Sequence, residues 1–131
     1  MGGPCFLKYN SKGRKQPGPE CTDNFLLRPF EHDGATYHSC EHAYQALKFP
    51  PGPHRVRVAA MVPFAGESGR SHGMRCWNEG QRGLPRSEWD RDKVATMLAV
   101  NRSKYAAHAD LREQLLATGG AEIVGGASTG W

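Results

Sequence analysis

The stretch HSCEHAYQALKF, which begins at His38, concentrates side chains that can bind a metal or take part in catalysis. On a β-strand, His38, Cys40 and His42 would share a face and could bind a zinc ion together, whereas on a helix they diverge. Ser39 is a good helix N-cap, and the residues from Ala43 to Leu47 are strong helix formers. The sequence therefore favours a helix here, and no metal site.

As a helix, the same stretch presents a carboxylate and an amine on one face. Glu41 and Lys48 are seven residues apart, which places them within about 20 degrees of each other around a helix axis. Tyr44 and Gln45 lie between them on the adjoining surface. A face of this composition is either an ordinary solvated helix surface or part of a functional site, and the surrounding sequence has to decide between them.

Short strands are predicted before this helix. The residues from Cys5 to Tyr9 can form one strand, and Asp33-Gly34 between Phe30 and Tyr37 is a β-hairpin signal. The stretch SKGRKQPGPE, residues 11–20, is rich in Gly, Pro and charge and predicts a solvated loop. We therefore expect one small antiparallel sheet.

About five helices are expected, over residues 40–49, 54–61, 65–70 and 88–106 and around Leu111 to Leu116. Ser87 followed by Asp90 resembles a capped start for the longest helix, from Glu88 to Ala106. The segment from Ser71 to Arg86 is rich in Gly and Arg without periodicity, which predicts a loop over a site. Together these elements indicate an α-rich α+β fold.

Composition limits the class of protein. A chain of 131 residues that is 38% hydrophobic fits one domain over residues 1–131, burying roughly two thirds of its unfolded surface. Its 17 Lys and Arg against 13 Asp and Glu give a net charge of +4, which favours anionic partners such as phosphates or nucleic acid.

The absence of an eighteen-residue apolar window and of a signal peptide predicts a cytoplasmic protein without a membrane partner. Four cysteines without a C-x-x-C pair predict free thiols. The oligomeric state is left open.

The order of motifs along the chain resembles the NADAR, or YbiA-like, domain family over about residues 5–120. That family's pattern runs from an S-N-F-type motif through D-G-x-x-Y-x-S-x-E-H-x-Y-Q-A-x-K to a later tryptophan followed by an acidic residue, and then T-G. The matching residues here are Asp23-Asn24-Phe25, Asp33-Gly34, Tyr37 to Phe49, Ser68-Gly69-Arg70, Trp89-Asp90 with Lys93, and Thr118-Gly119.

The resemblance implies cleavage of an N-glycosidic bond without metal or cofactor. Such cleavage passes through an oxocarbenium-like state that needs negative charge near C1. Glu41, at the positive end of its helix, suits this role in ionised form. Lys48 can attack C1 and form a Schiff base if burial lowers its pKa, or it can be a surface lysine bonded to Glu41. Trp89, between two acidic residues, is expected to be exposed enough to stack a base, the alternative being a hydrophobic staple.

A set of substrate-binding residues follows from the resemblance. Asn24 can bond a ribose hydroxyl or phosphate, or simply form a turn, and Arg70 can reach a diphosphate. The full set is Asn24, Phe25, Tyr37, Ser39, His42, Tyr44, Gln45, Arg70 and Asp90.

The resemblance implies two possible substrates: ADP-ribosylated guanine in nucleic acid, and ribosylaminopyrimidine intermediates of riboflavin biosynthesis. The net charge and the arginines between Arg70 and Arg86 favour the first. A non-catalytic module that binds ADP-ribose or a nucleotide, and a structural domain with a vestigial site, are alternatives. Family members continue past Thr-Gly with an acidic residue, an aspartate and W-G, whereas here no aspartate lies between Glu122 and Trp131. The domain is therefore expected to be shortened at its C-terminus.

Overall fold

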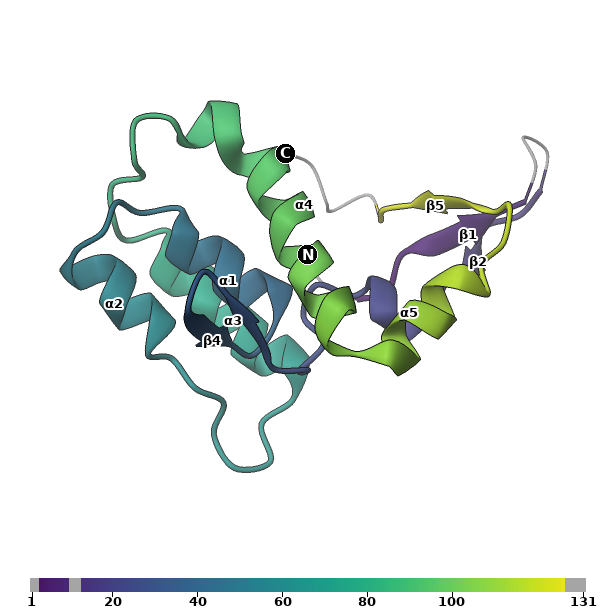
Figure 1. Ribbon diagram of the computed structural model, residues 1–131, viewed down its shortest axis with the longest axis horizontal. Helices are drawn as coiled ribbons and strands as arrows, with labels where there is room; N and C mark the ends of the chain where they lie inside the picture. The colour runs from purple at the N-terminus through teal and green to yellow at the C-terminus, as the bar shows by residue number, and fades with distance from the viewer. Residues whose placement is uncertain (1–2, 10–12, 127–131) are drawn as a thin grey trace.

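The computed structural model describes residues 3–9 and 13–126, and the expected tail position Trp131 lies outside them. Helices α1, α2 and α3 gather with a hairpin at one end of the molecule, α4 runs through the middle, and α5 with three strands forms the other end (Figure 1). The predicted α-rich α+β fold with five α-helices is confirmed. The elements are β1 (Phe6–Lys8), β2 (Gln16–Pro17), the 3₁₀ helix η1 (Glu20–Thr22), β3 (Phe30–His32), β4 (Ala35–Tyr37), α1 (Cys40–Leu47), α2 (Pro53–Ala59), α3 (Gly69–Gly80), α4 (Trp89–Ala107), α5 (Ala109–Leu116) and β5 (Glu122–Val124).

The predicted hairpin forms between β3 and β4. Its pairing brings His32 opposite Ala35, so the turn consists of Asp33 and Gly34. Both turn residues have positive φ, 49° for Asp33 and 79° for Gly34, which is the conformation that a two-residue hairpin of this twist requires. The hairpin packs against α1 and α4 and so helps to position α1.

The expectation of a single sheet is wrong, because the described strands form two sheets. The hairpin stands alone, and β1 is the centre of an antiparallel sheet with the order β2-β1-β5. Strand β2 lies within the stretch expected to be a loop, and Gly18 N–H donates to Cys5 O at 2.8 Å beside it. Strand β5 comes from the tail and pairs with β1. The pairing of β1 with β5 is long-range, so local sequence signals do not reveal it.

Helix α1 begins where it was predicted to begin. The Ser39 side chain accepts a hydrogen bond from His42 N–H at 3.1 Å, which is an N-cap. The helix ends at Leu47 rather than at Phe49, and Lys48 is its C-cap. Helix α4 is the longest of the described helices, as expected. Its N-cap is Glu88 and not Ser87, and no side-chain hydrogen bond caps it.

The short helix expected over residues 65–70 is wrong, and the loop expected from Ser71 to Arg86 is confirmed only over residues 81–86, because α3 occupies Gly69–Gly80. Ser68 caps it by accepting from Ser71 N–H at 3.1 Å. A Cβ at Gly73 would come within 2.6 Å of the Phe25 ring. This glycine therefore allows close packing of a helix against Phe25, whereas from sequence it was interpreted as a sign of a loop.

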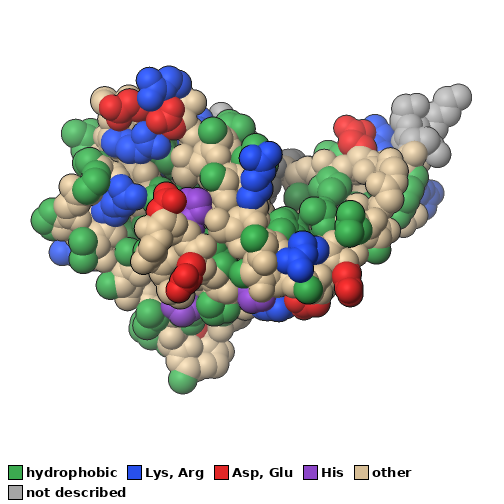
Figure 2. All heavy atoms as spheres, viewed as in Figure 1, with side chains coloured by type: hydrophobic (Ala, Val, Ile, Leu, Met, Phe, Trp, Pro, Cys, Tyr) green, Lys and Arg blue, Asp and Glu red, His purple; other side chains and the backbone are tan. Residues whose placement is uncertain are grey.

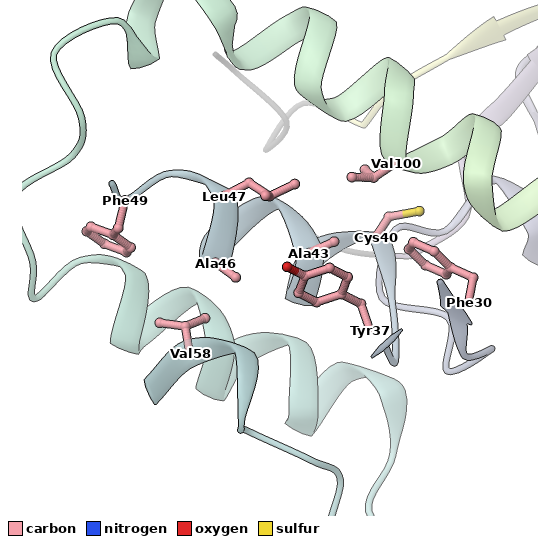
Figure 3. Close-up of a cluster of buried hydrophobic side chains, with 9 residues drawn as sticks. All are labelled: Phe30, Tyr37, Cys40, Ala43, Ala46, Leu47, Phe49, Val58 and Val100. Atoms are coloured by element: carbon pink, nitrogen blue, oxygen red, sulfur yellow. The ribbon is translucent and has the colours of Figure 1, made fainter. Parts of the chain in front are cut away.

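The core lies around α1, which contacts α2, α3, α4 and β4. Side chains from α1 meet others from the hairpin, α2 and α4 in one buried cluster (Figure 3). Its members are Phe30, Tyr37, Cys40, Ala43, Ala46, Leu47, Phe49, Val58 and Val100. The members on α1, which are Cys40, Ala43, Ala46 and Leu47, share one face of about 120 degrees. Glu41, Tyr44, Gln45 and Lys48 lie together on an adjoining face of the helix.

The segment before α1 is fixed by α4. Lys104 is fully buried, and its Nζ donates to Cys21 O at 2.7 Å. Tyr105 donates its hydroxyl to the same carbonyl at 2.9 Å. Asn101 Nδ2 donates to Asn24 Oδ1 at 3.3 Å, one helical turn earlier. The free thiol of Cys21 is fully buried beside them.

Charges of both signs lie side by side over the beginning of α4, at the upper left of Figure 2. Asp92 accepts from Arg86 and Arg91 at 2.8 Å each, and Lys93 lies 3.4 Å from Asp90. This end of α4 is therefore not a surface of one sign. None of the helices in the described ranges is long and apolar enough to cross a membrane.

Candidate active site

Glu41 lies in the first turn of α1 and is 8% exposed. Its N–H donates to Asn24 O at 3.0 Å, and its Oε1 accepts from Gln45 Nε2 at 2.8 Å. Burial raises the pKa of Glu41, while the Gln45 hydrogen bond and the charge of Lys48 oppose this rise. The sequence suggested that the helix end would favour the ionised form, but the cost of burying the charge is larger than that effect.

Lys48 follows at the other end of α1 and is half-buried. Its Nζ donates to Gly80 O, the last carbonyl of α3, at 2.9 Å. Burial lowers the pKa of Lys48, and the charge of Glu41 opposes the change. A lowered pKa increases the fraction of neutral amine, which is the nucleophilic form. Glu41 and Lys48 influence each other's ionisation, as their seven-residue spacing predicts for side chains on one side of a helix.

An aromatic pair lies next to these two residues. The Tyr44 ring centroid is 4.7 Å from that of Trp89, with the planes tilted by 60°. Trp89 is only 6% exposed, so the expectation of an exposed indole is wrong: Tyr44 covers the ring, and the Arg86 guanidinium lies 5.3 Å from its centroid. Tyr44 is the more accessible ring of the pair. Its pKa is raised to about 12 by burial, and the carboxylates of Glu41 and Asp90 add to the effect.

Four of the expected substrate-binding residues have contacts that are structural. Phe25 packs under α3 and Tyr37 lies in the core cluster. Ser39 is the N-cap of α1. His42 is fully buried, with Nε2 donating to Val58 O at 2.8 Å and Nδ1 accepting from His38 N–H at 3.1 Å. These contacts use both nitrogens of the His42 ring.

Two more of the expected substrate-binding residues, Asn24 and Arg70, differ in their distance from Glu41. Asn24 touches Glu41 through its backbone carbonyl, while its side chain bonds Asn101. Arg70 is exposed in the first turn of α3. Since Gly80 ends the same helix ten residues later, about 15 Å of helix separates Arg70 from the Lys48 contact. The structure therefore brings together Glu41, Tyr44, Gln45, Lys48, Trp89 and Asp90, with Asn24 behind them.

Arg86 belongs to this cluster, and sequence reasoning missed its role. Its N–H donates to Lys48 O at 3.0 Å and its Nε to Leu47 O at 3.2 Å, so it caps the end of α1. Its guanidinium also bonds Asp92 at 2.8 Å and so joins α1 to α4. No local sequence signal identifies a cap that comes from so far along the chain.

A pocket of about 410 Å³ adjoins the cluster through Leu47 and Arg86. Its other lining residues are His32, Asp33, Arg55, Asp92, Ala95, Thr96 and Ala99. Neither Glu41 nor Lys48 lines it. This pocket is therefore not the shared cleft that the sequence suggested for those two side chains.

Histidines meet in the core without forming a metal centre. The rings of His38, His42 and His72 lie 5.2 to 6.2 Å apart. His72 Nε2 is 2.6 Å from Met61 O, and the nitrogens of His42 are likewise occupied. Over residues 3–9 and 13–126, no group of three or more His, Cys, Asp or Glu side chains is placed to share a metal ion.

Comparison with known proteins gives the family. The family model for the NADAR domain matches residues 11–129 of this chain. N-glycosidase YbiA of Shigella flexneri serotype 5b (strain 8401) is 35% identical over 104 residues, which are 77% of this chain and 59% of that protein. The Escherichia coli (strain K12) protein of the same name is 34% identical over the same shares. The NMR structure of the E. coli protein YbiA matches with a TM-score of 0.63 at 30% identity, covering 76% of this chain and 55% of that one. The chain thus spans less than two thirds of the length of these relatives, and it belongs to the NADAR domain family.

Proposed function

We propose that the protein is an N-glycosidase that cleaves the bond between ribose C1 and a nitrogen base. The observation that carries this proposal is the grouping on α1 of a buried carboxylate, Glu41, and a half-buried amine, Lys48, next to the Tyr44–Trp89 pair. The name N-glycosidase of the curated relatives supports the same reaction class.

In the proposed reaction the Glu41 carboxylate stabilises the cationic sugar as the C1–N bond breaks. The neutral Lys48 amine bonds to C1 as the base leaves with the electron pair of the C1–N bond, and the base takes the proton that the amine nitrogen loses. Opening of the ribose ring gives an imine between C1 and Nζ, which water then hydrolyses to restore the lysine and release the sugar. Lys48 must first leave Gly80 O, which holds its Nζ in the resting structure.

Tyr44 is the side chain best placed to stack the base. It is half-exposed, and the buried Trp89 ring supports it from behind at 4.7 Å. Aromatic stacking tolerates different bases, because each base has a π face. Trp89 then acts by orienting Tyr44.

The substrate that we propose is ADP-ribosylated guanine in nucleic acid. The net charge of +4 supports it, because a polyanion is attracted to a basic protein. The arginines after Arg70 add less than the sequence suggested, because Arg75 lies 2.6 Å from Glu67 and Arg86 lies 2.8 Å from Asp92.

A ribosylaminopyrimidine is the second candidate substrate. The small exposure of Glu41, Gln45 and Trp89, at 8%, 3% and 6%, favours a ligand of nucleotide size over a nucleic acid strand. A module that binds ADP-ribose or a nucleotide without turnover is the remaining alternative, and it predicts binding without release of base.

The test is incubation of the full chain with each substrate and detection of released base and sugar by mass spectrometry. We expect faster release from the ADP-ribosylated guanine oligonucleotide, and we expect that rate to fall as salt is raised. Turnover confined to the pyrimidine would assign the second substrate. If neither substrate releases its base but binding is retained, the proposal that the protein is an enzyme is rejected.

Borohydride added during turnover tests the role of Lys48, because it reduces an imine to a stable adduct. We expect a sugar adduct on the parent protein and on Lys8→Ala, a control in β1, and none on Lys48→Ala. If Lys48→Ala stays active and no adduct forms on any variant, Glu41 activates water directly and Lys48 is only its ion partner.

A further inference from the structure

Gly80, the last residue of α3, touches two residues of the candidate site. Its carbonyl accepts from Lys48 Nζ, and its Cα faces the side-chain amide of Gln45. A Cβ at Gly80 would overlap Gln45 Oε1 and lie 2.7 Å from the carboxamide carbon. Its φ is not positive, so the requirement for glycine here comes from space and not from backbone conformation.

Gln45 is 3% exposed and is held between α3 and Glu41. Its Nε2 donates to Glu41 Oε1 at 2.8 Å, and its Oε1 has no hydrogen-bond partner among the described residues. A buried acceptor without a partner is unfavourable. The amide nevertheless has this orientation because the reverse one would direct its oxygen at the Glu41 carboxylate.

We propose that Gln45 is a positioning residue for Glu41 and not a substrate contact, and that Gly80 is a glycine because any side chain there would displace the Gln45 amide. The amide N–H fixes the direction of the carboxylate and favours its charged form. The inference rests on the proposed function, because Gln45 acts through Glu41.

The groups that face Glu41 determine what loss of this hydrogen bond does. Lys48, Tyr44 and Cys40 on α1 and Cys76 on α3 interact with its charge. Lys48 is the cation among these four, and the thiols and the phenol are neutral at pH 7. Without the Gln45 donor, the strongest of the effects that oppose burial is lost, so the carboxylate would accept a proton at higher pH.

The experiment is an NMR titration of the Glu41 carboxyl carbon in the full chain. Gln45→Met keeps the length of the side chain but removes the donor, and Gly80→Ala displaces the amide while Gln45 remains. Gly120→Ala is the matched control, since nothing lies within 4 Å of its added Cβ. We expect the pKa of Glu41 to rise by about one in both test variants, the usual size of a lost charge-assisted hydrogen bond, and to stay unchanged in the control.

The pH dependence of kcat provides a second readout. On the acidic side kcat should fall more steeply where Glu41 takes up its proton, and this break should move to higher pH by the same amount in Gln45→Met, while KM stays close to that of the parent. An unchanged pKa of Glu41 in Gln45→Met would overturn the proposal, as would a raised KM at constant kcat, which would make Gln45 a substrate contact. If Gly80→Ala does not fold, Gln45→Met alone decides. The titration needs no turnover. Absence of activity would therefore reject the proposed function, but the effect of Gln45 on the pKa of Glu41 could still be measured.

Discussion

Two faces of α1 carry ionisable side chains, and they differ in how those side chains are satisfied. On one face Glu41 has a side-chain donor in Gln45, and Lys48 bonds a helix-terminal carbonyl. On the other, the ring of His42 bonds only backbone groups, its Nδ1 accepting from the N–H of His38. The first arrangement leaves an amine and a carboxylate that influence each other's ionisation. The second fixes a neutral tautomer, so the imidazole serves packing.

The two faces also respond to pH in opposite directions. Burial lowers the pKa of His42 to about 4 and also lowers that of His38. Burial raises the pKa of Glu41. Acidification therefore costs the histidine face stability, because the unfolded chain takes up protons first, whereas protonation of Glu41 removes a buried charge and favours the folded state.

Loss of the Glu41 charge should have the largest effect. Glu41→Gln should reduce kcat by about a hundredfold or more, because the amide keeps the shape but not the charge that stabilises the sugar cation. Ligand binding should be retained, and the unfolding temperature should not fall, because a buried charge is removed. Steady-state kinetics and thermal unfolding measure these quantities. Activity within tenfold of the parent would remove Glu41 from the mechanism.

Acid should weaken the protein through the histidine face. The unfolded His42 protonates near pH 6.5 and the folded one only near 4, so stability should fall by about 3 kcal/mol between these values. Urea unfolding at several pH values measures it. The pKa values of Glu67, Asp92 and Asp110 are lowered to about 2. These carboxylates therefore lose their contribution to stability mainly below the pH range in which His42 acts. If the free energy of unfolding stays constant from pH 6.5 to 4.5, the lowered pKa of His42 is contradicted.

Truncation of His42 separates structure from chemistry. His42→Ala should cost about 2 to 3 kcal/mol of stability, because it leaves a cavity and two unpaired backbone groups. The pH slope described above should largely disappear with it. The kcat of the folded fraction should stay within about threefold of the parent. A large fall in kcat at full folding would instead support the sequence-based expectation that His42 binds substrate.

Changes at Tyr44 should have the smallest effects. Tyr44→Ala should raise KM five- to tenfold, which corresponds to about 1 kcal/mol of lost stacking. Tyr44→Phe keeps the ring and should change KM by less than about threefold. Equal KM values for Tyr44→Ala and the parent would show that the base lies elsewhere.

Local signals predicted the elements that hold the site. The Ser39 cap, the Asp33-Gly34 turn and the period of α4 depend on neighbours in sequence, and each was found. The seven-residue spacing likewise predicted that Glu41 and Lys48 interact. Each of these features involves residues close together in sequence. Over such short separations, helix or turn geometry alone determines where the side chains lie relative to one another.

Features that depend on distant contacts were not predictable. Gly73 predicted a loop, but it lies in a helix packed against Phe25, and Trp89 was expected to be exposed, but Tyr44 covers it. The room that Gly80 leaves for Gln45 is of the same kind. A sequence shows that a side chain is small or polar, but only the fold shows what lies against it.

The pairing of β1 with β5 has a consequence for the order of folding. It joins Phe6 to Val124, so forming it closes a loop of nearly the whole described chain, at a high cost in entropy. The contacts of α1 with the hairpin, α2, α3 and α4 all lie between residues 30 and 107. We expect them to form while the terminal strands are still apart, both in refolding and during synthesis on the ribosome. The β1–β5 amides should accordingly exchange with solvent deuterium before those of α1.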